Sequence, residues 1–334
     1  MVSVAVIIVT VVRAVGNGDI ANGNGGDGLE IASEIQTEGV LFRDTAQQRS
    51  FGRLAVTDGG GTAPRQIADL KCSRVAFAGG RGVCLTIKRN VISNYSALVF
   101  NERFEVERTV QLAGIPSRTR VSPGGRIAAT TVFVFGHSYA DGAFSTRTSF
   151  IDLDSGEIID NMERFTVLNH GESFAAVDFN FWGVTFVDDE RFFATLGTGG
   201  KTFLVDGDVT TRTANVLREG VECPSLSPDG RRIAFKKQVS AGIGPLRWRL
   251  SVLELATGRE YELAETRSVD DQVSWLDDER ILYSLTADGE PTPSTDDGQS
   301  TVSTNVWVAA ADGGGRPEIY LENASSPVVV RDPI

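Results

Sequence analysis

The feature that most constrains the fold is a turn motif that recurs along the chain. Its clearest copy, at residues 227–235, reads Ser-Pro-Asp-Gly-Arg-Arg-Ile-Ala-Phe. The proline presets φ for a turn, the aspartate can cap the turn through its side chain, and the glycine accepts a positive φ. The motif therefore predicts a hairpin between two short strands. Looser copies stand at residues 78–84, 122–128, 187–193 and 276–282.

The copies are spaced like the blades of a β-propeller. The strands that follow the turns begin at Val83, Ile127, Phe192, Ile233 and Ile281. Three of the intervals are about 40–50 residues, as expected for one blade, and the interval before Phe192 is longer. A second turn follows each hairpin, at residues 101–102, 154–156, 206–208, 257–258 and 312–314. Each unit thus holds four strands, A to D in chain order, which is the content of one blade.

A sixth unit begins at Val40 and lacks its strand A. The segment 326–330, Ser-Pro-Val-Val-Val, follows the last strand D and has the character of a strand. Placed beside residues 39–44, it would complete the first blade from the other end of the chain and leave no open sheet edges. We therefore predict an all-β, six-bladed β-propeller of four-stranded antiparallel blades over residues 39–334, with the first blade closed by strands from both termini.

The unit S-P-D-G-x-x-I-A-F, followed by a strand that ends in x-x-T-G, resembles the repeat of TolB-like β-propellers. The resemblance covers residues 39–330 and is most specific in the blades that begin near Arg118 and Cys223. It implies a six-bladed propeller that is exported and binds other proteins. Related propellers also serve as the gating domain of prolyl-oligopeptidase-type peptidases and as polysaccharide lyases.

The N-terminal residues indicate export. Residues 2–12 form an apolar run that is too short to span a membrane but has the length of a signal-peptide core. We interpret residues 1–15 as an export signal or a truncated membrane anchor, and the Gly/Asn-rich residues 16–38 as a flexible tether. The composition, rich in Arg, Ala, Val and Gly, is typical of a high-GC bacterial genome. We expect an extracytoplasmic cell-envelope protein that is monomeric and secreted or attached to the membrane by its N-terminus.

Composition and motifs argue against most kinds of catalytic site. The net charge is −12 and no Lys/Arg cluster occurs, which argues against nucleic-acid binding. Residues 136–140 and 171–175 lack the second glycine of a G-x-S-x-G elbow, which argues against a serine peptidase. With only two histidines, we expect no metal, no cofactor and no catalytic residues. The acid pairs at 188–189 and 277–278 fall in the repeated turn, so a turn role explains them, although calcium in an Asp-rich loop stays an alternative.

The long connections predict a partner-binding face. Residues 135–148, 160–181, 237–246 and 286–304 are B–C loops or links between blades, which share one face of a propeller, and we call this the long-loop face. Long loops on a rigid scaffold are a usual place for function. The candidate partner-binding residues are His137, Tyr139, Phe144, His170, Phe174, Trp248, Asp296 and Asp297. Their aromatic rings would contact a protein partner, whose identity the sequence does not reveal, or fold back over the blades. The alternative function is a small-ligand or sugar-binding sensor, or a lyase-type enzyme, that uses the axial channel.

Cys72 and Cys84 flank the A–B turn of the second blade, and an exported protein could oxidise them. A tight turn at residues 79–80 pairs Val75 with Cys84, which leaves Cys72 about 10 Å further along the strand. That offset favours two free, buried thiols over a disulfide. A bridge would need Cys72 to lie outside the strand ladder.

Overall fold

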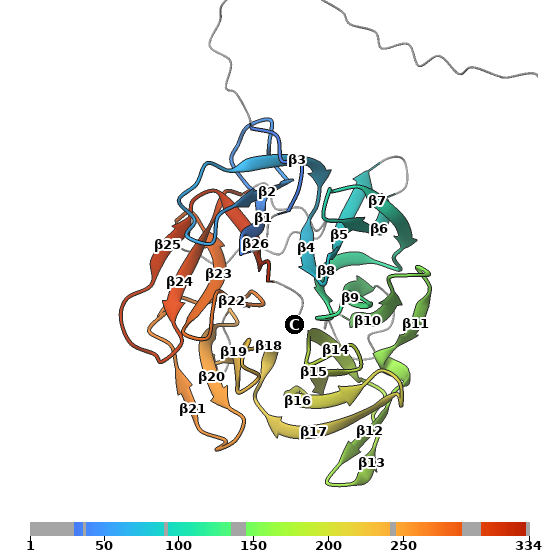
Figure 1. The fold of residues 1–334 in the computed structure, drawn as a ribbon. Helices are drawn as coiled ribbons and strands as arrows, with labels where there is room; N and C mark the ends of the chain where they lie inside the picture. Colours follow the sequence, from blue (N-terminus) through green and yellow to red (C-terminus); the bar gives the residue numbers. More distant parts are fainter. Residues whose placement is uncertain are drawn as a thin grey trace, which may run out of the picture.

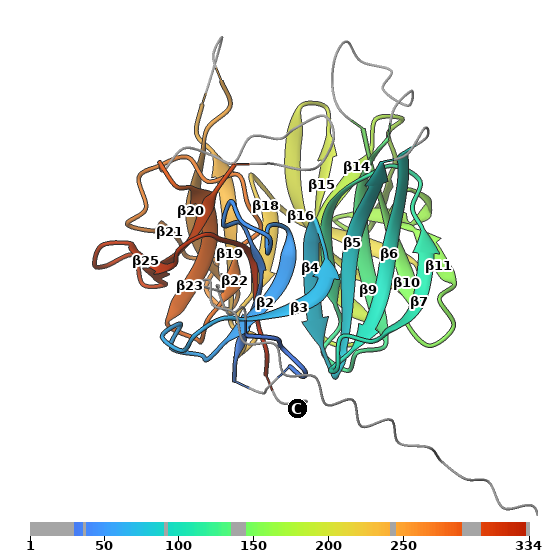
Figure 2. The same cartoon turned by 90° about the horizontal axis from the view of Figure 1, so that it is seen from above.

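The computed structural model describes residues 30–35, 38–89, 93–134, 145–240, 245–288 and 302–331. These residues form a ring of six β-sheets around a central axis (Figure 1). The innermost strand of each sheet faces the axis, and the strands run between two faces of a disc (Figure 2). The chain is therefore an all-β, six-bladed propeller, as the repeat predicts.

The first three blades each have four antiparallel strands, named in order from the axis outward. The first blade contains β26 (Ala324–Val329), β1 (Val40–Asp44), β2 (Arg53–Thr57) and β3 (Gln66–Lys71). The second contains β4 (Arg74–Ala78), β5 (Arg81–Arg89), β6 (Ser93–Asn101) and β7 (Val106–Gln111). The third contains β8 (Ile115–Val121), β9 (Ile127–Val134), β10 (Ser145–Asp152) and β11 (Ile158–Asn161).

The fourth blade is larger than predicted. It contains β14 (Asn180–Phe186), β15 (Arg191–Thr198), β16 (Lys201–Asp208) and β17 (Thr213–Glu219), with β12 (Thr166–Asn169) and β13 (Glu172–Phe174) added outside β17. A 3₁₀ turn, η1 (Met162–Arg164), precedes the added strands. The fifth blade contains β18 (Glu222–Leu226), β19 (Arg232–Gln238), β20 (Trp248–Glu254) and β21 (Glu260–Glu262). The sixth contains β22 (Ser274–Trp275), β23 (Arg280–Thr286), β24 (Thr304–Ala310) and β25 (Glu318–Leu321).

The first blade is closed by the C-terminal strand, as predicted. β26 lies innermost and pairs antiparallel with β1, with Val329 opposite Val40. Val328 and Val330 are 7% and 4% exposed and belong to the core between the first and second blades. Because the last strand occupies the inner edge of the first sheet, the ring closes through a strand ladder and not only through side-chain packing.

The A–B turns of neighbouring blades are joined on the face opposite the long loops, which we call the turn face. The backbone N–H of Gly124, in the third blade, donates to Oδ1 of Asp189 in the fourth (3.0 Å). In the same way the N–H of Asp229, in the fifth blade, donates to Oδ1 of Asp278 in the sixth (2.9 Å). The first acid of each pair caps its own turn, since Asp188 accepts from the N–H of the second and third residues after it. The acid pairs therefore have the turn role that the sequence predicts.

Residues 30–35 of the N-terminal segment pack against the first two blades. Residues 30–35 lie against β3, where the N–H of Ala32 donates to the carbonyl of Ile67 (3.1 Å). The N–H of Ile35 donates to the carbonyl of Glu102 in the second blade (2.8 Å), and Ile35 is 6% exposed. The end of the predicted tether, residues 16–38, is thus part of the folded body from Glu30 to Ile35, while residues 1–29 lie outside the described residues.

Cys72 and Cys84 form a disulfide, with their Cα atoms 5.3 Å apart. The predicted register is present, since Val75 pairs with Cys84. The preference for free thiols is nevertheless not what the structure shows, because Cys72 does not belong to the ladder. It lies in the two-residue connection between β3 and β4, which turns back toward β5. The bridge ties the first blade to the second, and Cys223 remains a buried free thiol.

Candidate functional site

The link between the third and fourth blades forms a β-hairpin that projects from the outer edge of the fourth blade. β12 runs parallel to β17, with Val167 opposite Ala214, and β13 pairs antiparallel with β12. Met162, Phe165 and Val167 are buried in the core between the two blades, which anchors the base of the hairpin. At its tip His170 and Gly171 both have positive φ, 51° and 81°, as a two-residue hairpin turn requires.

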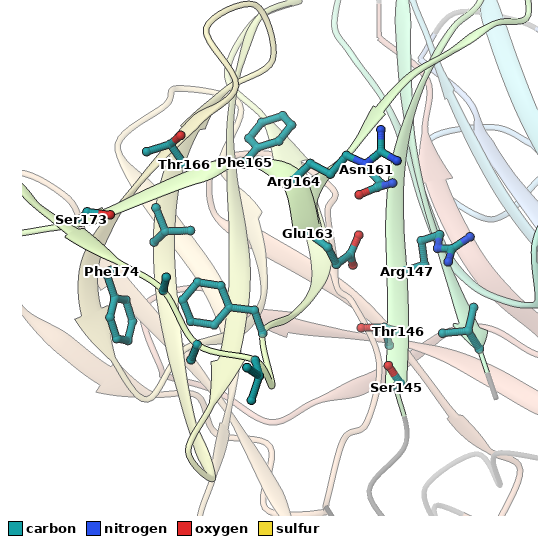
Figure 3. Close-up of a pocket in the computed structure, with 16 residues that line it drawn as sticks. Ser145, Thr146, Arg147, Asn161, Glu163, Arg164, Phe165, Thr166, Ser173 and Phe174 are labelled. Carbon is teal, nitrogen blue, oxygen red and sulfur yellow. The ribbon is translucent and has the colours of Figure 1, made fainter. Parts of the chain in front are cut away.

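This hairpin and the neighbouring third blade enclose an open pocket of about 630 Å³ (Figure 3). One wall comes from the end of β9 and the start of β10, and the other from η1, β12, β13 and the segment that leads to β14. These strand ends flank a B–C connection and a link between blades, so the pocket opens on the long-loop face. The polar lining residues are Ser145, Thr146, Arg147, Asn161, Glu163, Arg164, Thr166 and Ser173, and the aromatic ones are Phe165, Phe174 and Phe179.

Glu163 is the titratable group with the most altered environment in this pocket. Its Oε1 accepts the backbone N–H of Thr148 (3.2 Å), and Arg147 lies on the other side of β10 from Glu163 (Figure 3). Burial of the carboxyl raises the pKa of Glu163 to about 7, although its own N–H, the N–H of Thr148 and the charge of Arg147 act in the opposite direction. The residue as a whole is nevertheless exposed to solvent. It can therefore meet a ligand as an acid or as an anion near neutral pH.

The opposite wall is apolar and aromatic. Phe174 packs edge-to-face on Phe179, with ring centres 5.2 Å apart, and also contacts Phe203 of the fourth blade. Phe174 and Phe179 are only half-buried, and Val177 beside them is 89% exposed. An exposed apolar surface next to charged groups is the composition of a contact surface for another molecule.

Of the predicted partner-binding residues, the structure describes His170, Phe174 and Trp248, and it does not bring these three together. Phe174 lines the pocket, and His170 lies at the tip of the same hairpin but does not line it. Trp248 is in the fifth blade, away from both. The predictions for His137, Tyr139, Phe144, Asp296 and Asp297 fall outside the described residues. Sequence reasoning missed Arg147, Asn161 and Glu163, which have no motif that marks them.

Trp248 belongs to a charged cluster beside the axis. Its Nε1 donates to Oε1 of Glu222 (3.1 Å), and the ammonium of Lys236 lies 4.3 Å from the centre of its ring. Lys236 also pairs with Glu222 (3.6 Å) and with Asp270. Burial disfavours the ionised form of Asp270, but the positive charges of Lys236 and Arg118 outweigh this effect. The pKa of the carboxyl is therefore lowered. Trp248, on the third strand of the fifth blade, is therefore held by contacts within its own chain.

The axial channel is crossed by the segment 270–273, which precedes β22. From this segment Asp271 pairs with Arg74 of the second blade (3.1 Å). Gln272 donates to the carbonyls of Val184 and Pro224, in the fourth and fifth blades (2.9 and 3.1 Å). The segment thus contacts three blades across the axis, and a cavity of about 20 Å³ lies beside it.

No group of three or more His, Cys, Asp or Glu residues within the described ranges is arranged to hold a metal ion. Within the same ranges, no helix has the length and apolar character needed to cross a membrane.

The comparisons with known proteins identify the fold. No protein-family model and no curated protein matches the sequence. Among solved structures, TolB from Acinetobacter baumannii matches with a TM-score of 0.59 and 16% identity, over 88% of this chain and 67% of that one. A chain of a nidogen/laminin complex matches with a TM-score of 0.52 and 9% identity, over 89% and 99%. An oligogalacturonate lyase in complex with manganese matches with a TM-score of 0.50 and 13% identity, over 78% and 72%.

Proposed function

We propose that this TolB-like six-bladed β-propeller is a non-catalytic, extracytoplasmic scaffold that binds a protein partner through its long-loop face. The contact would be centred on the pocket between the third and fourth blades. The partner would place an apolar side chain against Phe174 and Phe179, and a polar or charged group against Arg147 and Glu163.

The observation that carries this proposal is the open pocket itself. The hairpin β12–β13 is added outside the four strands that a blade needs, and it creates one wall of the pocket. That wall exposes Val177 almost fully and leaves Phe174 half-buried. Keeping apolar side chains in water is unfavourable unless another molecule covers them, which supports binding at this face.

Two further observations support export. The Cys72–Cys84 disulfide is consistent with an oxidising compartment, because such bridges are rare in the cytosol. The described residues begin at Glu30, and the apolar residues 2–12, which precede them in the sequence, have the length of a signal-peptide core.

Affinity capture with matched variants tests the proposal. The double variant Phe174→Asp, Val177→Asp places two charges on the apolar wall, and Ile319→Asp places one charge at a 44% exposed position on β25 of the sixth blade. We expect a partner that is retained by the native chain and by Ile319→Asp but lost with the double variant. Equal retention by all three chains, each shown to be folded by circular dichroism, would place the interface elsewhere.

A second function has a specific observation in its favour. A pocket of about 630 Å³ lies in the usual size range of small-molecule sites, and its polar wall offers Arg147, Asn161 and Glu163 to a hydroxylated or acidic ligand such as a sugar acid. The sequence places this alternative in the axial channel, where the cavity beside the segment 270–273 has a volume of about 20 Å³. Thermal denaturation with a panel of sugars and sugar acids separates the two functions. A ligand that raises the Tm of the native chain but not of Arg147→Met would favour the sensor.

A further inference from the structure

A small cavity lies on the propeller axis, where innermost strands from three blades meet the segment 270–273. Its volume is about 20 Å³, which is room for one water-sized occupant. The lining residues are Arg74 and Val75 of β4, Arg118, Thr119 and Arg120 of β8, Asp271 and Gln272, and Ser326 and Pro327 of β26. Three guanidinium groups and one carboxylate therefore surround the same point.

The positive charges at this level of the channel exceed the negative ones. Arg74 pairs with Asp271 (3.1 Å), and Lys236 pairs with Asp270. Arg118 lies 3.8 Å from the same Asp270 carboxylate, which it shares with Lys236. Glu222 also pairs with Lys236 (3.6 Å), so Asp270, Asp271 and Glu222 face these three cations, and Arg120 adds a fourth.

Among these cations, Arg120 makes its hydrogen bond to an uncharged group. Its Nη2 donates to a neutral backbone carbonyl, that of Val273 (2.6 Å). Burial, with added repulsion from Arg118 and Arg74, lowers the pKa of Arg120 to about 10 despite the attraction of Asp271. Burying a cation without a counter-charge is unfavourable, so a further negative charge nearby would stabilise this arrangement.

Two polar atoms in the cavity wall have no hydrogen-bond partner among the described residues. They are Nε of Arg118 and Oγ1 of Thr119, and both are buried. Such orphaned groups are rare in native proteins, and a bound water or ion commonly satisfies them. Nε of Arg118 can only donate, and the threonine hydroxyl can donate, so both can bind an acceptor.

We propose that this axial cavity binds one small monovalent anion, of the halide class, between Arg118 and Arg120. With room for about one water-sized occupant, the cavity fits a monatomic ion better than phosphate or sulfate. A water molecule would satisfy the orphaned donors but would leave the surplus positive charge of the guanidinium groups uncompensated. A chloride ion would meet both needs and hold the segment 270–273 against β8.

Bromide scatters anomalously and therefore locates the site directly in crystals of the full chain. With bromide in place of chloride, we expect an anomalous peak at hydrogen-bond distance from Nε of Arg118. Density for a water molecule without an anomalous peak would overturn the proposal.

A solution measurement tests the same site independently. At constant ionic strength, chloride replaces gluconate, which is too large for the cavity, and the Tm of the native chain should rise by about 2–4 °C as the site saturates. The rise should persist in Arg103→Met, an exposed position in the second blade, and disappear in Arg120→Met. A Tm that depends on ionic strength alone would refute the site. If Arg120→Met does not fold, the bromide peak and the halide titration of the native chain decide.

Discussion

Closure of the ring by β26 makes a prediction that the structure allows us to quantify. The double variant Val328→Ala, Val330→Ala keeps the backbone ladder with β1 but removes two methyl groups from each buried side chain. Each methyl group contributes about 0.8 kcal/mol of transfer free energy, and a residual cavity adds to the loss. We expect about 2 kcal/mol per valine and about 4 kcal/mol in total, a large share of the 5–15 kcal/mol typical of a folded domain.

Urea denaturation measures this loss. With a slope of about 3 kcal/mol per molar urea, the unfolding midpoint should fall by about 1 M or more. Val106→Ala is the matched control, because that valine is 46% exposed on β7 and its truncation should change the free energy of unfolding by less than about 0.5 kcal/mol. Circular dichroism and tryptophan fluorescence should report one shared transition, since the closed ring is expected to unfold as a unit.

One result would refute this reasoning. If the double variant unfolds at the same urea concentration as the native chain, the inner strand of the first blade does not stabilise the ring. A chain that lacks residues 326–334 provides the stronger perturbation, since it also exposes the edge of β1. It should be at least as destabilised as the double variant.

Three other predictions concern single groups. Asp278→Ala should lower the free energy of unfolding by about 1 kcal/mol, because the N–H of Asp229 loses its acceptor, while Asp278→Asn should restore most of it; unchanged denaturation of the alanine variant would contradict the turn contact. Reduction of the Cys72–Cys84 bridge should lower the free energy of unfolding by about 3 kcal/mol, as loop closure predicts, and a midpoint insensitive to reductant would argue against it. Because the folded state raises the pKa of Glu163 from 4.5 to about 7, it binds this proton more tightly than the unfolded chain does, so stability should fall as pH rises from about 4.5 to about 7. Glu163→Gln should flatten that part of the Tm-against-pH curve, and identical curves would show that the carboxyl titrates normally.

The blades could be predicted from the sequence because their turns have local causes. Pro228, Asp229 and Gly230 set a turn through their own backbone preferences, wherever the turn lies in the fold. The same holds for Asp188 and Asp277, each of which caps its own turn. The contact made by the second acid of each pair could not be predicted, because its hydrogen-bond partner belongs to a different blade.

The candidate site was predicted only in part, and the reasons are physical. Phe174 was identified because it is an aromatic residue in a long link. The hairpin around it was not, although His170 and Gly171 between Thr166–Asn169 and Glu172–Phe174 are a weak hairpin signal. Glu163 carries no motif, and its altered pKa arises from atoms brought around it by the fold. The disulfide was judged by the register of a ladder to which Cys72 does not belong.

The segment 270–273 has a consequence for how the two faces of the disc can communicate. Its contacts reach the second, fourth and fifth blades, and Arg120 contacts it from the third. The segment therefore links four blades across the axis. A partner that binds at the long-loop face and shifts one blade against another would therefore strain this segment. The segment 270–273 opposes such shifts, because a blade that slides loses its hydrogen bonds and ion pairs to the segment.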